Sequence, residues 1–158
     1  WGRWRTNHGE GGIITAISFE EPVMSSTVVV RENGKGRYQQ EVIAGQHRLL
    51  ADEPVSLGGT DAGPAPFDYL MAGLGACTTM TLRMYAERKG LALRQVSVSL
   101  ALDSVERDGI RHDRIIRTIT LDGDLGPEQR ARLLDIAGRC PVARALRQPL
   151  VLESHLAD

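Results

Sequence analysis

The two cysteines are the residues of this chain with the most distinctive chemistry. Cys77 lies among small residues in LGACTTMT, and Cys140 lies directly before a proline in GRCPVARAL. A thiol can attack an electrophile or form a disulfide, but free cysteine also packs as a small apolar side chain and is among the most buried residue types. Two interpretations are therefore open: both cysteines are core residues, or they meet in space and act together.

The local sequence predicts a different environment for each thiol. Residues at steps of three and four form one face of a helix that includes Cys77: Leu70, Leu74, Cys77, Thr81 and Met84. Cys140 is expected at the N-cap of a helix that starts at Pro141, where free N–H groups and the helix dipole stabilise a thiolate. These local environments, taken alone, predict that Cys140 is the more acidic thiol.

Other kinds of site are not indicated by the sequence. The four histidines show no metal-ligand spacing among themselves or with the cysteines: His8, His47, His112 and His155. The glycines near residues 58–63 match no phosphate-binding loop, and nothing marks a base beside either cysteine for a hydrolase. We therefore expect no metal and no bound cofactor.

The composition is typical of a globular protein, and neither its charge nor its apolar runs indicate binding to nucleic acid or insertion into a membrane. Apolar residues make up 42% and charged residues 25%, and the net charge is −1. This charge predicts no binding to nucleic acid or to an anionic membrane, and no apolar run approaches the roughly 18 residues of a membrane span. Without a signal peptide pattern, and with too few cysteines for a disulfide scaffold, the chain is expected in the cytoplasm.

The order of the expected elements predicts an α+β fold with a mostly antiparallel sheet. Residues 1–12 are expected to be a flexible tail, and residues 13–158 a single domain. Strands are expected over residues 13–19, 24–32, 36–43, 47–51, 96–102, 114–121 and 150–152, with a tight turn at Asn33-Gly34. A long helix should start at Pro66 and end at Gly90, and shorter helices should start at Pro127 and Pro141. Gly73 and Gly75 indicate close packing against this long helix, such as by a partner helix.

Read together, the two cysteine segments resemble the OsmC/Ohr family of thiol-dependent peroxidases, and its OsmC-like branch in particular. The resemblance covers roughly residues 25–155. It is carried by short matching segments: DEP at 52–54, GG at 58–59, GPAP at 63–66, LGACT at 74–78, LRMYA at 82–86, DGDL at 122–125, IA at 136–137 and RCPV at 139–142. The resemblance implies an intertwined homodimer with a long central helix and with active sites at the subunit interface.

The resemblance also implies roles for individual residues. Cys77 matches the peroxidatic cysteine and Cys140 the resolving cysteine, which reverses the order of acidity predicted from local environment. Arg37, in the pair Gly36-Arg37, matches the arginine that stabilises the thiolate and the departing alkoxide. The hydroperoxide branch carries an orienting glutamate ten residues before the peroxidatic cysteine, where this chain has Phe67. Asp68 or Glu53 is the candidate substitute.

The implied activity is reduction of organic hydroperoxides through a two-cysteine disulfide cycle, in defence against oxidative stress. An external dithiol, such as that of a lipoylated protein, would restore the thiols. A second hypothesis is a non-enzymatic module of the same fold that binds small apolar ligands, and Phe67 favours it. A third is a purely structural dimer in which Cys77 and Cys140 are core residues.

Overall fold

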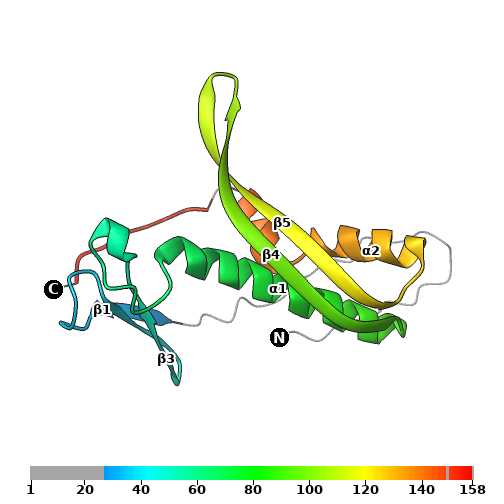
Figure 1. The fold of residues 1–158 in the computed structure, drawn as a ribbon, viewed down its shortest axis with the longest axis horizontal. Coiled ribbons are helices and arrows are strands. Elements are labelled where there is room, and N and C mark those ends of the chain that lie inside the picture. The colour runs from blue at the N-terminus through cyan, green and yellow to red at the C-terminus, as the bar shows by residue number, and fades with distance from the viewer. Residues whose placement is uncertain (1–26, 149, 158) are drawn as a thin grey trace.

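The computed structural model describes residues 27–148 and 150–157 as two antiparallel sheets and three α-helices (Figure 1). The tail expected over residues 1–12 and the strand expected over residues 13–19 lie outside the described residues. The α+β class with antiparallel sheets is confirmed. In the described C-terminal segment, residues 150–157 form no strand, so the closing strand expected over residues 150–152 is wrong.

The first sheet has three strands in the order β1 (Val28–Glu32), β2 (Gln40–Ala44) and β3 (His47–Ala51). The tight turn expected at Asn33-Gly34 is wrong, because Glu32 pairs with Gln40 and residues 33–39 form a wider loop. The Asn33 side chain holds this loop: its Nδ2 donates to Gln39 Oε1 (2.7 Å) and its Oδ1 accepts from the Lys35 N–H (2.9 Å). The Asn33 side chain thus supplies hydrogen bonds within the wider loop, which takes the place of a two-residue turn.

The second sheet is one long hairpin of β4 (Ala92–Arg107) and β5 (Ile110–Asp124). Both strands extend well beyond the ranges expected from the sequence, and they pair along almost their whole length. Asp108 and Gly109 make the turn with positive φ angles of 53° and 73°, the backbone geometry that a two-residue hairpin turn favours. The tip of this hairpin projects beyond the helices (Figure 1).

Helix α1 (Pro66–Lys89) begins and ends close to where the sequence predicts. Pro66 occupies its first turn, the Asp68 carboxylate accepts the Ala65 N–H (3.1 Å), and Gly90 ends it with a φ of 61°. Helices α2 (Pro127–Ala137) and α3 (Pro141–Arg147) follow the hairpin, and both contact α1. The main core forms between α1, α2 and the base of the hairpin, from Leu82, Ala86, Leu93, Leu125, Leu133, Ile136 and Ala137.

Gly75 allows α1 to lie very close to strand β4. A Cβ built on Gly75 would lie 2.9 Å from Leu100 Cδ1, closer than real Cβ atoms approach a neighbour. For Gly73, two residues earlier in α1, a Cβ built in the same way would have nothing within 4 Å. The partner helix expected at these glycines is therefore wrong for Gly75, where the close neighbour is a strand of the same chain.

The loop between β3 and α1 is organised by a buried carboxylate. Asp52 is 3% exposed and accepts hydrogen bonds from the N–H groups of Glu53, Thr60 and Ala62 and from the Thr60 hydroxyl (2.5–3.2 Å). The Thr60 hydroxyl, with these backbone N–H groups, lowers the pKa of the Asp52 carboxyl below its ordinary value. This one side chain therefore closes the turn around the 3-10 helix Val55–Leu57 that leads into α1.

We predict that Asp52→Asn lowers the free energy of unfolding at neutral pH, because an amide accepts these hydrogen bonds less well and carries no charge. Since the folded-state pKa is lowered, this contribution is complete above the ordinary aspartate pKa of 3.8 and is lost as the pH falls through the folded-state value. The gap between wild type and Asp52→Asn in denaturant titrations should therefore narrow in acid. Asp61→Asn, in the same loop but exposed, is the matched control.

Two neighbouring leucines of α2 test the main core. Leu133 is fully buried at 0% exposure, whereas Leu134 is 64% exposed. Leu133→Ala should lower the free energy of unfolding by about 2–5 kcal/mol through lost burial and the cavity left behind. Leu134→Ala should change it by about 0.5 kcal/mol or less. Equal effects in urea titrations would show that α2 does not pack on α1 through this face.

Candidate functional site

The two cysteines lie together at the contact between α1 and α3. Cys77 is on α1 and Cys140 caps the start of α3, and both thiols are free. Cys140 is fully buried in a small second core with Leu74 and Ala143, and the half-buried Cys77 packs against this core. The thiols are close enough for the side chain of Cys140 to act as a hydrogen-bond partner of Cys77. The structure thus brings together residues that are 63 positions apart.

The first turn of α3 supplies a backbone N–H group to each sulfur. The Ala143 N–H donates to Cys140 Sγ at 3.3 Å, which is the side-chain cap that the sequence around Pro141 predicts. The backbone N–H of Val142 acts on Cys77, whose pKa it lowers. Free N–H groups at a helix start favour negative charge, so both sulfurs lie where α3 can stabilise a thiolate.

The environment of Cys77 favours the protonated thiol. Burial is the main cause that raises the pKa of Cys77 above its ordinary value, and the neighbouring Cys140 raises it further. The Val142 N–H and the Thr81 side chain act in the opposite direction without reversing the shift. Among residues 27–148 and 150–157, therefore, no strong cation acts on Cys77 to make it acidic.

A guanidinium that the sequence analysis missed reaches the cysteine pair from β5. Arg117 Nη1 donates to Thr78 Oγ1 (2.8 Å), and the same oxygen lies 3.6 Å from Cys140 Sγ. The signal was present in the sequence: Arg117 lies on the same face of β5 as Ile115 and Ile119, two residues from each, and all three are half-buried. An arginine in the apolar phase of an alternating strand is unusual unless its charge is used.

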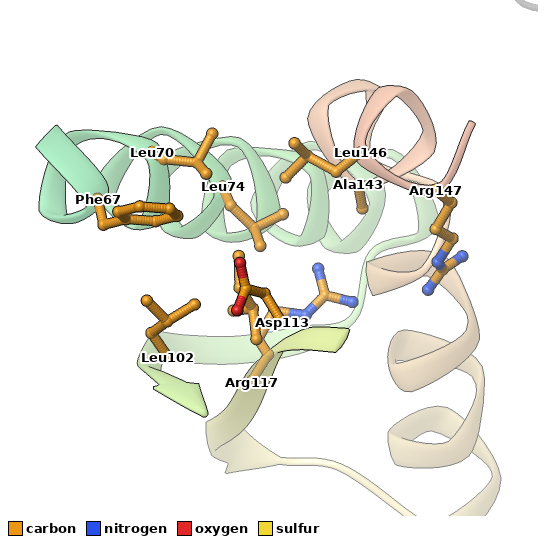
Figure 2. Close-up of a pocket in the computed structure, with 10 residues that line it drawn as sticks. Phe67, Leu70, Leu74, Leu102, Asp113, Arg117, Ala143, Leu146 and Arg147 are labelled. Atoms are coloured by element: carbon orange, nitrogen blue, oxygen red, sulfur yellow. The ribbon is translucent and has the colours of Figure 1, made fainter. Parts of the chain in front are cut away.

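An apolar groove, drawn in Figure 2, lies against the small core that holds Cys140. Its volume is about 320 Å³, and it lies between α1 and α3 on one side and the β4–β5 hairpin on the other. Leu74, Ile115 and Ala143 line it and also pack around Cys140, so these three side chains lie between the groove and the buried thiol. Phe67, Leu70, Leu102 and Leu146 complete its apolar wall, and Asp113, Arg117 and Arg147 supply charge.

The other residues expected at the site lie elsewhere in this chain. Arg37 is exposed in the loop between β1 and β2, with its guanidinium 5.1 Å from the centre of the Tyr38 ring. The Asp68 carboxylate caps α1 through Ala65, and Glu53 accepts the Asp61 N–H with its backbone oxygen. Phe67 is 49% exposed and lines the groove. The catalytic roles of Arg37, Asp68 and Glu53 therefore stay predictions.

The family model for the OsmC-like protein matches residues 59–155, which includes both cysteines, the groove and all three helices. The chain belongs to the OsmC-like family. Comparison of the sequence with curated proteins finds no match.

Solved structures of this family share the fold. The OsmC-like protein of Mycoplasma pneumoniae is 18% identical, with a TM-score of 0.67 over 80% of this chain and 89% of that one. The organic hydroperoxide resistance protein OsmC of Legionella pneumophila is 19% identical, with a TM-score of 0.63 over 80% and 92%. The organic hydroperoxide resistance protein OhrB of Bacillus subtilis is 20% identical, with a TM-score of 0.57 over 80% and 93%. At these identities the likeness concerns the fold.

Two further features bear on what the OsmC-like chain can hold. Over residues 27–148 and 150–157, no three His, Cys, Asp or Glu side chains gather as metal ligands would. None of the helices in this part of the chain is both long and apolar enough to cross a membrane.

The raised pKa of Cys77 can be measured by alkylation. Because the thiolate is the nucleophile, reaction of Cys77 with iodoacetamide should keep accelerating above the pH at which an ordinary thiol is fully ionised. Cys140→Ala removes one cause of the shift but not burial, so the pH profile should move lower and still lie above that of an ordinary thiol. Mass spectrometry assigns the label to Cys77. A profile that levels off below neutral pH would show that another cation reaches this thiol.

Proposed function

We propose that this OsmC-like chain reduces organic hydroperoxides with Cys77 as the attacking thiol and Cys140 as the resolving thiol. The observation that carries the proposal is the meeting of the two free thiols at one end of α3, beside an apolar groove. The apolar wall suits the organic part of a hydroperoxide, and the nearby N–H groups suit a sulfur that becomes negative. Family membership supports the same chemistry.

In the first step the Cys77 thiolate attacks one oxygen of the O–O bond. A sulfur–oxygen bond forms, the O–O bond breaks, and the alkoxide leaves and takes up a proton to become the alcohol. Cys77 is oxidised to a sulfenic acid and the peroxide is reduced. Cys77 is half-buried, whereas Cys140 is fully buried, so Cys77 is the thiol more accessible to a peroxide.

In the second step the Cys140 thiolate attacks the sulfur of the Cys77 sulfenic acid. The disulfide forms, the sulfur–oxygen bond breaks, and the hydroxide leaves as water with the proton of the second thiol. A dithiol then reduces the disulfide by exchange and is itself oxidised. A lipoylated protein as this dithiol, a cytoplasmic location and an intertwined homodimer stay part of the proposal. So does Arg37, whose approach to Cys77 would require the second subunit.

A second candidate function is a binding module for small apolar ligands. Phe67 favours it, because an aromatic ring lines the groove where the hydroperoxide branch has its orienting glutamate. The raised pKa of Cys77 favours it too, since a protonated thiol is a poor nucleophile. The peroxidase proposal therefore needs a source of positive charge at Cys77 beyond the contacts within this chain.

The two serine variants separate the roles of the thiols. Cys77→Ser should abolish consumption of cumene hydroperoxide even in the first turnover, because the nucleophile is gone. Cys140→Ser should still consume one equivalent, after which the unresolved sulfenic acid is oxidised further to sulfinic acid by excess peroxide. Mass spectrometry after one equivalent and after excess measures both outcomes, with the double serine variant as the background.

The reverse pattern would contradict the assignment of roles. If Cys140→Ser were inert and Cys77→Ser became overoxidised, Cys140 would be the attacking thiol. If the wild type consumed no peroxide, and Phe67→Ala weakened its binding of a small apolar probe such as cumyl alcohol, the binding module would replace the peroxidase.

A further inference from the structure

Thr78 and Arg117 form a buried hydrogen-bonded chain that ends at Cys140. Arg117 Nη1 donates to Thr78 Oγ1 at 2.8 Å, Thr78 Oγ1 donates to Leu74 O at 2.7 Å, and Cys140 Sγ lies 3.6 Å from the same hydroxyl oxygen. We propose that Arg117, acting through Thr78, stabilises the Cys140 thiolate and so enables the resolving step. Thr78 contacts the reacting sulfur, and Arg117 is a positioning residue.

The burial of Cys140 creates the need for such a device. Cys140 and Thr78 are both 0% exposed, so a thiolate at this place has no access to water. A buried charge that lacks compensating donors is strongly disfavoured. The Ala143 N–H is one donor to the sulfur. The Thr78 hydroxyl is the side-chain group placed to become the second.

The hydrogen positions in the Arg117–Thr78–Cys140 network can be assigned from its geometry. The single hydroxyl hydrogen of Thr78 is used on the Leu74 carbonyl, and its oxygen accepts from Arg117. One lone pair of that oxygen is left for the S–H of Cys140. When Cys140 loses its proton, the Thr78 hydroxyl can turn from Leu74 to the sulfur, while Arg117 stays bonded to the hydroxyl oxygen. The guanidinium polarises this O–H and places its charge one side chain away from the thiolate.

The charged groups around Cys140 leave Arg117 as the cation available to it. Within the described ranges Arg117 makes no ion pair, although Asp113 lines the same groove. On α3, Arg147 donates to the Gly138 carbonyl (3.0 Å), and at the end of α2 Asp135 pairs with Arg132 and Arg139. On α1 the neighbouring titratable group is Cys77. The Thr78 side chain alone connects the Arg117 guanidinium to the sulfur of Cys140.

In the proposed cycle this device acts on the second step. Attack of Cys140 on the Cys77 sulfenic acid forms the disulfide and releases water, and it requires Cys140 to give up its proton before or during attack. The first step requires a thiolate at Cys77 instead. The kinetic part of the inference thus rests on the proposed function, whereas stabilisation of the Cys140 thiolate can be tested without any peroxide.

The direct test is an alkaline titration in a Cys77→Ser background, where Cys140 is the remaining cysteine. Thiolate ultraviolet absorbance is followed, with the double serine variant subtracted to remove the tyrosine signal. Adding Thr78→Val or Arg117→Gln should move the rise in absorbance to a pH about one unit higher, the lower end of the effect of an opposite charge. Thr78→Ser and Arg117→Lys, which keep the hydroxyl and the charge, should restore most of the shift.

Matched controls exclude a merely structural effect. Thr79→Val removes a hydroxyl from the next residue of α1, which bonds to Ala76 O (3.0 Å). Arg114→Gln removes a charge from the same strand, where Arg114 pairs with Asp103. Neither should move the titration. If Thr78→Val and Arg117→Gln also leave it unchanged while circular dichroism shows folded protein, the proposal is wrong. The same conclusion follows if either control moves it equally.

The second test follows one turnover in chains that keep both cysteines. After one equivalent of cumene hydroperoxide, Arg117→Gln should slow disulfide formation about tenfold, because a thiol pKa one unit higher leaves about a tenth of the thiolate. Peroxide consumption should slow less. Equal slowing of both steps would mean that Arg117 acts on substrate or on Cys77, and would overturn the resolving role. If neither the wild type nor Arg117→Gln consumes peroxide, the proposed function fails. The titration then tests by itself whether Arg117 and Thr78 stabilise the Cys140 thiolate.

Discussion

The close contact between α1 and strand β4 at Gly75 is the constraint on which the site depends. Leu100 Cδ1 occupies the space that a side chain at position 75 would need, so the helix lies directly on the hairpin. Cys77 and Thr78 follow within one turn of α1, and Arg117 is the β5 residue paired with Leu100. The same contact therefore fixes the helix, the strand and the distance from Thr78 to Arg117. A larger residue at position 75 would have to displace the Leu100 side chain from this contact.

Burial sets the chemistry of the two thiols in opposite ways. Exclusion of water raises the pKa of Cys77, because a thiolate there loses hydration and lies beside a second thiol that can itself become charged. The same exclusion makes each remaining donor more effective, since charge is poorly screened in the interior. The Ala143 N–H in the first turn of α3 donates to Cys140, and Thr78 with Arg117 adds a second source of stabilisation at the same sulfur. Such a site stabilises the thiolate of the buried resolving cysteine, whereas the attacking cysteine needs additional positive charge to become a thiolate.

The groove beside the thiols matches the chemistry proposed for them. Its wall is mostly aliphatic, with Phe67 in place of the glutamate of the hydroperoxide branch, and its charged side chains are Asp113, Arg117 and Arg147. An organic hydroperoxide has an apolar body and a polar O–O group, and both parts find a matching surface here. The Asp52 loop, which closes through one carboxylate, leads directly to the start of α1 that carries Phe67.

Local sequence determined much of this protein. Proline and glycine at the ends of the helices, alternation along the hairpin and the helical spacing around Cys77 are nearest-neighbour effects, so α1, α2, α3 and the α+β class could be predicted. The family motifs also pointed to the cysteine pair. Tertiary structure alone decided the rest. The Asn33 loop depends on a side-chain bond to Gln39, and Gly75 packs against Leu100 rather than a partner helix. Arg117 reaches Cys140 through Thr78, across three elements distant in sequence. Contacts of this kind depend on how whole elements pack, and no local pattern encodes the distance between two atoms that only packing brings together.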